Sequence, residues 1–590
     1  MKHNRLFFII FSVTIFLYLF FKASLQGISN DEALTFFNYI HKNTFLPGDA
    51  SWDANNHILN SIFSIQFYKL FGKDLIFLRL TNVLSFLLYA YYVYKSSHFL
   101  KTNWSKVALQ VGLLTPVFLL DMFSVSRGYG MSIAFLWAAI YHFVNYFKSK
   151  SNKDNLGFWI FIGLAVWSNL SLINSYLIII GAFTVYLIIK FKKIGKLQKV
   201  LFIFPGLTVF IAAAIYSNVL KEKGLLYYGN QEGFVETTLA TLAEFQFGFN
   251  NQILAYSWLV LMLVLIIMIF SSIKKVKKLQ DLYTFKYIIG LFLFLNIVGV
   301  ILLNVILEVN FPEDRTAIYL IPLFIAAFVL VIDEWSVKIK QLKWLHLLIL
   351  IIPFGFIQNA SLKGTNLWKD LYLSQEMHDV IAKEQLKSQR QLTVNGYHLF
   401  KWSWQYFNLN QDLSYLSFVP FPDTCSDIII ARPSDLENYD LNSYEKVYQS
   451  DFNKVSILKR KKYLTKKLVL KTEDQLTLEG KDEFSKLFHD TVKADFKRLN
   501  LTFKMSVDSE KKPLQTKLVI ETKRKNKEQI YYDLIPLDWL RSEWNNDQFL
   551  LDRNLPTSAE DTVIVKAYLW NNKNETFNAK ISELSFYSLE

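Results

Sequence analysis

The chain has 590 residues, of which 52% are hydrophobic and 16% aromatic, and its formal net charge at pH 7 is +14. This length predicts several domains, and the long apolar runs exclude a single soluble globule. The positive charge does not indicate nucleic acid, because the Lys residues cluster between apolar runs and no nucleic-acid-binding motif is evident. Cys425 is the single cysteine, so an internal disulfide is excluded.

The N-terminus has the basic flank and apolar run of a signal peptide, in residues 1–5 and 6–21. No small-x-small cleavage motif follows the apolar run. We therefore expect a signal anchor that is retained in the protein.

The first 359 residues carry repeated apolar runs of the length that a bilayer-crossing helix needs. We count about eleven predicted spans, and the polar step between the fifth and sixth leaves one long bent helix as the alternative there. The predicted spans are approximately 4–22, 75–95, 106–121, 130–148, 156–169, 171–190, 198–218, 253–272, 284–307, 316–335 and 343–359.

The distribution of Lys between these runs predicts an orientation. With a cytoplasmic N-terminus, every inner loop is basic, and the acidic and mixed clusters fall in the outer loops 23–74, 121–129, 219–252 and 308–315. An odd number of spans then places the chain after about residue 360 outside the membrane. The abundance of Lys, Asn, Ile and Phe favours a bacterial inner (plasma) membrane.

Two outer segments have helical patterns without the length of a span. Residues 57–71 read as an amphipathic helix on the membrane surface, and residues 234–249 as a second surface helix. Long loops of this kind more often carry function than merely connect spans.

The composition changes after residue 359, where hydropathy falls and short β-rich runs begin. Residues 360–462 predict a small extracytoplasmic α/β domain, with a helix at 373–386 and strands at 392–394 and 428–430. Residues 463–590 predict a jelly-roll-like β-sandwich, because short strands of period two alternate with turns. Its tryptophans favour carbohydrate binding by stacking, or are core and rim aromatics: Trp539, Trp544 and Trp570.

The first outer loop holds an acidic pair, Asp31 and Glu32, directly after the first span. Ser29 and Glu32 also fit the S-x-x-E capping box, so a solvated first helical turn is the alternative to a catalytic role. The same loop supplies further polar candidates: Asp53, Asn56 and His57.

Two later clusters combine arginine and tyrosine at the ends of spans. One contains Asp121, Arg127 and Tyr129, and the other contains Arg315 and Tyr319. Such side chains can simply anchor a helix at headgroup level or reach into water. The functional interpretation is that the guanidinium groups bind a phosphate, which they can contact through two parallel hydrogen bonds.

Together these motifs resemble the GT-C superfamily of membrane glycosyltransferases. The resemblance rests on the Asp-Glu pair in the first loop, Asn56-His57 before an amphipathic helix, Phe-Leu-Arg79-Leu at the second span, and Arg315-x-x-x-Tyr319-x-x-Pro322. It covers about residues 1–335, and the most similar families are protein O-mannosyltransferases and lipid A aminoarabinose transferases.

The resemblance implies transfer of a hexosyl or pentosyl group from a polyprenyl-phosphate donor to a protein, lipid or glycan acceptor outside the membrane. Asp31 matches the family's general base, and Asp121 lies where the family tends to place a second acidic residue. One departure concerns His57, because the family often has His-Pro-Pro here and this chain has His57-Ile58-Leu59.

The implied assignment of residues has two parts. Asp31, Glu32 and Asp121 are the expected catalytic residues. The expected substrate-binding residues are Asp53, Asn56, His57, Arg127, Tyr129, Arg315 and Tyr319, with Arg127 and Arg315 stabilising the leaving phosphate. No ligand spacing requires a metal, although a divalent cation could share the phosphate.

Two other classes of protein remain as alternatives. A transporter or flippase of lipid-linked sugars would place ionisable residues deep inside its spans, whereas the polar clusters here fall at one face. A membrane-anchored binding protein would need only one span and does not explain eleven.

Overall fold

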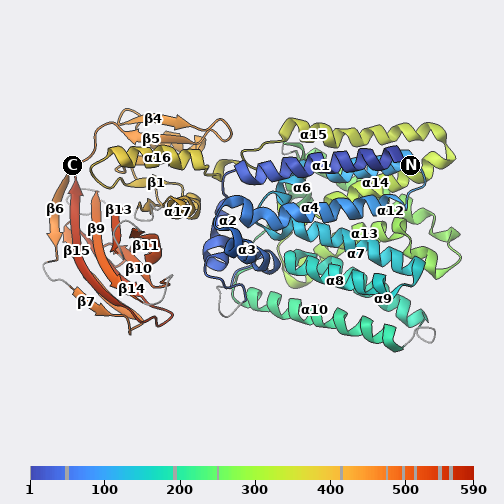
Figure 1. Cartoon of the computed structure of the whole chain (residues 1–590), viewed down its shortest axis with the longest axis horizontal. Helices are drawn as coiled ribbons and strands as arrows, with labels where there is room; N and C mark the ends of the chain where they lie inside the picture. The colour runs from blue at the N-terminus through green and yellow to red at the C-terminus, as the bar shows by residue number, and fades with distance from the viewer. Residues whose placement is uncertain are drawn as a thin grey trace. The chain divides into compact units, whose positions relative to one another are not determined.

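The computed structural model describes residues 2–46, 52–190, 196–226, 228–248, 251–411, 416–472, 476–493, 498–509, 514–542, 548–556 and 562–590 (Figure 1). Contacts within the chain define two compact units. The first comprises Met1–Gln26 and Thr35–Leu367, and the second comprises Gly27–Leu34 and Trp368–Glu590. The boundaries therefore fall at residues 26/27, within the short helix α2 (Asn30–Thr35) and at residues 367/368.

The first unit is built from apolar helices. In the part of the chain that the structure describes, seven helices are long and apolar enough to cross a membrane. They are α1 (Lys2–Leu25), α4 (Leu75–Ser97), η2 with α9 (Leu170–Lys190), α12 (Gln252–Ser271), α13 (Phe285–Leu307), α14 (Leu320–Lys338) and η8 with α15 (Lys340–Asn359). An eighth span results if α5 (Asn103–Leu114) and α6 (Val117–Phe123) count as one, with a bend of 56°.

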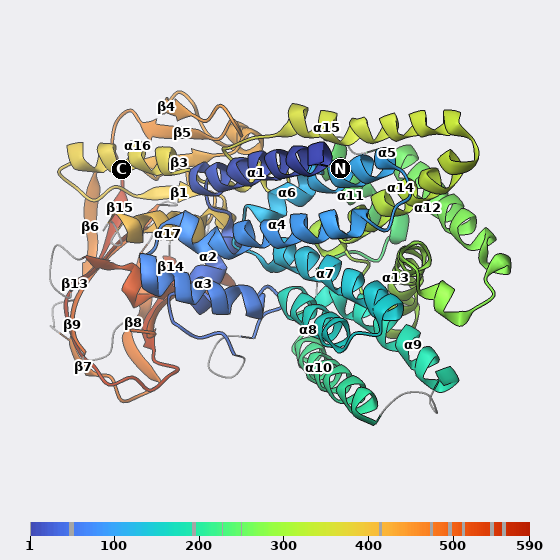
Figure 2. The ribbon, with the colours of Figure 1, turned by 45° about the vertical axis from the view of Figure 1, so that its right-hand side comes forward.

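The predicted class, a polytopic helical membrane domain, is confirmed, and the count of about eleven spans is not. Each predicted range does contain a helix. Three of these helices are not among the seven: α7 (Gly128–Ser149), α8 (Asn152–Ser168) and α10 (Lys196–Glu222). Figure 2 shows α4, α7 and α8 packed side by side in this unit.

Two local features of the sequence set helix ends in this unit. Pro116 lies at the bend between α5 and α6, where its ring and missing N–H prevent a continuous helix. Asn169 separates α8 from η2, and its side-chain oxygen accepts a hydrogen bond from the Ser171 amide at 3.2 Å. The predicted spans at 156–169 and 171–190 are thus separate helices.

Arg79 fixes the end of the first helix. Its side chain is fully buried in α4 and donates to the carbonyl oxygens of Ala23 at 2.8 Å and Gln26 at 3.1 Å. These carbonyls at the end of α1 have no partner within the helix and carry its negative partial charge. The buried guanidinium of Arg79 therefore fixes the end of α1, where the first loop begins.

The surface segments predicted from the sequence are helical. Residues 57–71 contain α3 (Ile58–Phe71), which begins directly after His57. Residues 234–249 contain η4 (Phe234–Leu239) and α11 (Ala240–Phe247), while Phe249 lies outside the described residues.

The second unit begins, after residue 367, with a five-stranded sheet. The strand order is β2 (Phe418–Val419), β1 (Val394–Gly396), β3 (Ile428–Ala431), β5 (Ser456–Arg460) and β4 (Tyr444–Gln449). The first three strands are parallel and the last two pair antiparallel. With α16 (Gln375–Lys387) and α17 (Lys401–Asn410), this is the expected α/β fold.

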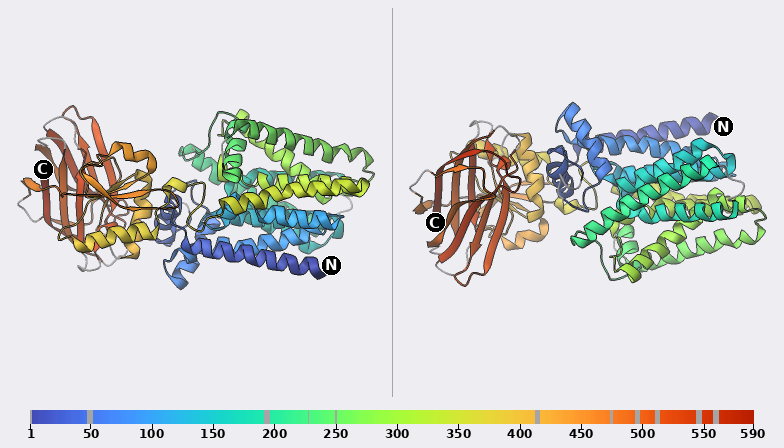
Figure 3. Two further views of the ribbon diagram at one scale, coloured as in Figure 1. Left: turned by 90° about the horizontal axis from the view of Figure 1, so that it is seen from above. Right: turned by 90° about the horizontal axis from the view of Figure 1, so that it is seen from below.

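The remaining strands form two antiparallel sheets, seen as two layers in Figure 3. One sheet has the order β11 (Gln529–Pro536), β10 (Lys517–Lys523), β14 (Thr562–Trp570) and β8 (Phe484–Lys493). The other contains β12 (Arg541–Ser542), β13 (Gln548–Leu555), β9 (Leu499–Asp508), β15 (Asn578–Leu589) and β6 (Lys466–Lys471), and β7 (Leu476–Glu479) also pairs with β15.

Alternation along the strands builds the core between these sheets. In β14 every second residue is buried, from Val563 to Leu569, while the residues between them are partly exposed. This period of two is the signal that predicts a half-buried strand. The predicted β-sandwich is therefore confirmed as part of the fold.

Cys425 is expected to report on which side of the membrane the second unit lies. Its side chain is 7% exposed, and burial raises the pKa of its thiol to about 11, so the folded protein should react slowly with maleimides. After brief exposure of intact cells to urea, a membrane-impermeant maleimide should label Cys425 if the unit is extracytoplasmic. Labelling only after the membrane is opened would contradict the predicted orientation.

A matched control is a Cys425→Ser protein carrying Lys277→Cys. Lys277 is exposed and lies in a loop that the charge pattern places inside. This variant should be labelled only in opened cells.

Candidate functional site

The acidic pair after the first helix is ordered by a capping box. The Glu32 carboxylate accepts hydrogen bonds from the backbone amide and the hydroxyl of Ser29, both at 3.2 Å, and the Glu32 amide donates to the Ser29 hydroxyl at 3.4 Å. Ser29 and Glu32 are buried, whereas Asp31 is partly exposed. The geometry therefore commits Glu32 to the start of α2.

The loop before α3 is held by its own polar side chains. The Asn55 amide donates to Asp53 at 2.8 Å, and the Asn56 side chain donates to the Phe45 carbonyl at 3.1 Å. Ser61 donates to the Asn56 side-chain oxygen at 2.8 Å. Asn56 thus connects two parts of the first loop to the first turn of α3.

Arg127 lies at the N-cap of α7 and is fully buried. Its guanidinium donates to the Thr35 hydroxyl at 2.8 Å and to the Asn55 side-chain oxygen. Thr35 is the last residue of α2, the helix whose second residue is Asp31. Asn55 is a partner that the sequence motifs did not single out.

Tyr129 brings the two predicted phosphate-binding arginines to one place. The guanidinium carbons of Arg127 and Arg315 each lie 5.9 Å from the centre of the Tyr129 ring. An aromatic ring attracts cations through its negative faces, which helps to hold two like charges near one another. The structure thus joins side chains that are far apart in the sequence.

Arg315 is positioned by two residues that sequence reasoning did not assign to the site. It lies 4.4 Å from the ring centre of Tyr228 and 3.2 Å from the carboxylate of Asp314. The Tyr228 hydroxyl donates to the same carboxylate at 2.5 Å. Asp314 has a φ of +42°, a left-handed conformation that is uncommon for residues other than glycine and that marks strained, often functional positions.

His57 packs against the same tyrosine. Its ring lies 4.5 Å from that of Tyr129, edge to face, and its Nδ1–H donates to the Ser168 carbonyl at 2.6 Å. Burial lowers the pKa of His57 well below its ordinary value, and the charges of Arg127 and Arg315 lower it further. The imidazole is therefore neutral in the folded protein.

Gly128 makes this packing possible. A Cβ atom at residue 128 would lie 1.9 Å from the Ser168 carbonyl oxygen and 2.9 Å from Nδ1 of His57. Both distances are shorter than any real contact, and one of the atoms belongs to the backbone. Only glycine fits beside the Ser168 carbonyl and the His57 ring.

Asp121 lies in a buried ion pair. Its carboxylate is 3.0 Å from Nζ of Lys22, and it also accepts a hydrogen bond from the Asn366 amide at 3.3 Å. Lys22 in turn donates to the carbonyl oxygens of Ser361 and Gly364 at 2.6 and 2.7 Å. This network ties α1 and α6 to the segment after α15, which is a structural use of the carboxylate.

The remaining candidates occupy different environments. Tyr319 is buried at the start of α14. Trp539 is 7% exposed and packs edge to face on Trp402, so it is a core aromatic. Trp570 is partly exposed and its ring is parallel to that of Phe484, with 6.3 Å between the centres. Trp544 lies outside the described residues.

Metal ligands do not gather in the described part of the chain. Among those residues, no three His, Cys, Asp or Glu side chains lie together in a way that could hold a metal ion. The groups that surround Tyr129 are two guanidinium groups and a neutral imidazole, and the Asp314 carboxylate pairs with one of the guanidinium groups.

No family model and no curated protein matches the chain. Among solved structures it is similar to ArnT from Cupriavidus metallidurans bound to undecaprenyl phosphate, with 9% identity, a TM-score of 0.41, and coverage of 78% of this chain and 98% of that one. It is also similar to the Archaeoglobus fulgidus oligosaccharyltransferase, with 10% identity, a TM-score of 0.41, and coverage of 94% and 97%. A third similar structure is the arabinosyltransferase EmbB from Mycobacterium smegmatis, with 11% identity, a TM-score of 0.33, and coverage of 98% and 64%. Two of the three are sugar transferases by name.

Proposed function

We propose that the chain is a membrane glycosyltransferase that moves a sugar from a polyprenyl-phosphate donor to an extracytoplasmic acceptor. The observation that carries this proposal is the convergence of Arg127 and Arg315 on Tyr129. Two guanidinium groups beside one ring form a strong site for an anionic group, since charge-assisted hydrogen bonds to phosphate oxygens are roughly twice as strong as neutral ones.

Transfer of a sugar requires charge stabilisation where the phosphate departs. In the proposed mechanism Arg127 and Arg315 bind the phosphate in the donor and stabilise the negative charge that grows as the glycosidic bond breaks. Asp314 and Tyr228 hold Arg315 in position, and Thr35 and Asn55 do so for Arg127. The neutral His57 packs on Tyr129 without adding to the positive charge.

Transfer also requires a base for the hydroxyl group of the acceptor. We assign this role to Asp31, whose carboxylate is not part of the capping box. The proton of the acceptor hydroxyl passes to Asp31 as the oxygen attacks the anomeric carbon. Glu32 is then a positioning residue that fixes the start of α2. A catalytic role for Asp121 would require its pair with Lys22 to open.

The proposal is tested by comparing cells with and without the protein by mass spectrometry of glycans and glycolipids. We expect one sugar mass to disappear from an extracytoplasmic acceptor and the corresponding polyprenyl-phosphate sugar to accumulate. If the protein were a flippase, the cells without it would instead keep the donor on the cytoplasmic leaflet, where externally added glycosidase cannot reach it. Unchanged acceptors and donors would refute the proposal.

A further inference from the structure

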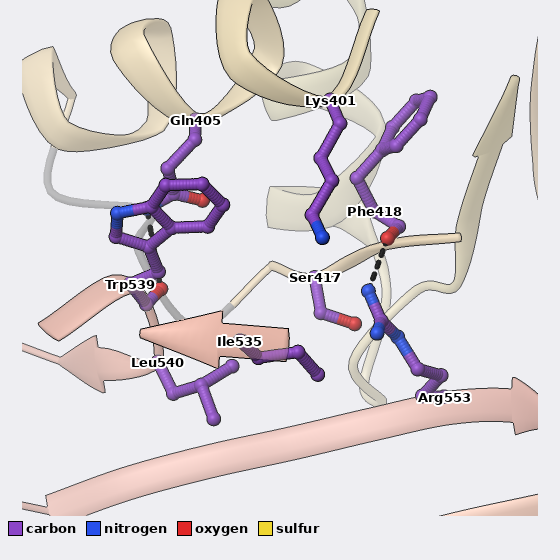
Figure 4. A pocket seen from close by; sticks show the side chains of 8 residues that line it. All are labelled: Lys401, Gln405, Ser417, Phe418, Ile535, Trp539, Leu540 and Arg553. Carbon is purple, nitrogen blue, oxygen red and sulfur yellow. Dashed lines mark hydrogen bonds between the residues drawn. The ribbon is translucent and has the colours of Figure 1, made fainter. Parts of the chain in front are cut away.

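The second unit contains a small cavity between the α/β fold and the β-sandwich. It is lined by residues of α17 and β2 on one side and of β11, β13 and the turn after β11 on the other (Figure 4). The cavity volume is about 10 Å³, which is room for roughly one water molecule. Its lining residues are Lys401, Gln405, Ser417, Phe418, Ile535, Trp539, Leu540 and Arg553.

Among the residues that the structure describes, the charged groups at this cavity do not balance. Nζ of Lys401 lies 2.5 Å from the carboxylate of Asp533, and Arg553 pairs with the other oxygen of that carboxylate. The Tyr531 hydroxyl also donates to Asp533, at 3.0 Å. Two cations thus share one carboxylate, which leaves one positive charge where Arg553 is only 1% exposed. A buried charge without a counterion is unfavourable.

One donor of Arg553 is also unused. Its Nη2 donates to the Phe418 carbonyl and its Nη1 to Asp533, but its Nε–H has no hydrogen-bond partner among the residues that the structure describes. Figure 4 shows the side chain reaching into the cavity from β13. A buried donor without an acceptor is rare in folded proteins and calls for a bound group.

We propose that this cavity binds a small monoanion, either a free ion or the carboxylate of an acidic sugar. The anion neutralises the excess charge and accepts from the Arg553 guanidinium and the Lys401 ammonium. The apolar walls formed by Phe418, Ile535 and Leu540 disfavour a dianion, which would bring a net negative charge into the same place.

The dimensions limit how the ligand sits. The space takes a chloride ion or one carboxylate oxygen, and the rest of a larger ligand extends past Lys401, whose side chain is 16% exposed. Because Lys401 belongs to α17 and Arg553 to β13, an anion between them joins the α/β fold to the sandwich. This inference does not depend on the proposed transferase activity.

The experiment uses the full-length protein purified in detergent. Thermal unfolding is followed while sodium chloride, acetate or glucuronate replaces the sodium salt of a bulky sulfonate buffer at constant ionic strength. Ligands that bind only the folded state raise Tm in a saturable way. Relative to the sulfonate salt, we expect a saturable rise in Tm with chloride and with acetate. Neutral glucose should leave Tm unchanged. Equal Tm values in all salts would overturn the proposal.

Two variants locate the effect. Lys401→Gln should raise the Kd for acetate at least tenfold. Lys466→Gln, which removes another partly buried lysine paired with Asp552 in the same unit, should leave that Kd within twofold. The same Kd in the Lys401 variant as in the wild type would overturn the assignment.

If Lys401→Gln does not fold, competition between the two anions in the wild-type protein tests the proposal. Chloride must compete with acetate, because both are proposed to occupy one site. Binding of both anions without competition would overturn the proposal. Glucuronate identifies the source of the carboxylate. Tighter binding than acetate indicates an acidic sugar, and equal or weaker binding indicates a free ion.

Discussion

Asp31→Asn is expected to reduce sugar transfer by about a hundredfold or more, with normal membrane insertion and expression. Asparagine keeps the size and most of the hydrogen bonding of aspartate and removes only its basicity. Because the Asp31 carboxylate is not part of the capping box, its replacement should leave the start of α2 intact. Transfer rates of membranes adjusted to equal protein content measure the effect.

Glu32→Gln is the matched control for this experiment. It weakens the hydrogen bonds with Ser29, so the expected result is a loss of about 0.5–2 kcal/mol in stability, the usual cost of a damaged helix cap. Catalysis should fall much less than in the Asp31 variant. If Asp31→Asn transfers sugar at the wild-type rate while Glu32→Gln or Asp121→Asn is inactive, the assignment of the base is wrong.

Arg127→Lys and Arg315→Lys are expected to lower kcat/KM for the lipid-linked donor by about 10- to 150-fold each. Lysine keeps the charge but loses the planar pair of donors, and a hydrogen bond to a charged group contributes about 1.5–3 kcal/mol. Initial rates at varied donor concentration separate this loss from any loss of folded protein.

Arg79→Lys provides the comparison for these two variants. Arg79 is as deeply buried in the same unit, but its guanidinium donates to carbonyl oxygens at the end of α1. Its replacement should lower thermal stability and leave the KM for the donor close to the wild-type value. Wild-type donor kinetics in both Arg127→Lys and Arg315→Lys would reduce those arginines to anchors at the membrane surface.

The elements of the fold follow closely from local patterns in the sequence. Apolar runs place helices because length and hydropathy act within one segment, as in the range 75–95 and α4 (Leu75–Ser97). Alternation places strands for the same reason, as in β14. The span count is less predictable, because α7, α8 and α10 are helices in predicted ranges that are not among the seven helices long and apolar enough to cross a membrane.

Partners distant in the sequence are what local patterns cannot provide. Asn55 and Tyr228 belong to the arginine site through tertiary contacts, and neither lies in a motif. The pair of Lys22 with Asp121 has the same origin, since an acidic residue at a span end gives no sign of its counterion. Trp539 reads as a candidate for stacking on sugars, but packing against Trp402 buries it.

The segment around Asp31 is synthesised long before most of the unit in which it folds. Residues 27–34 leave the ribosome early, yet the unit that they join otherwise begins at Trp368. The Ile28 amide donates to the Leu373 carbonyl at 3.1 Å, and a Cβ atom on Gly27 would lie 2.4 Å from the same oxygen. The segment therefore lacks its contacts with the second unit while every helix of the first unit is being synthesised. A nascent or truncated chain lacks this arrangement, so the proposed base reaches its final position only once the last part of the protein has been made and folded.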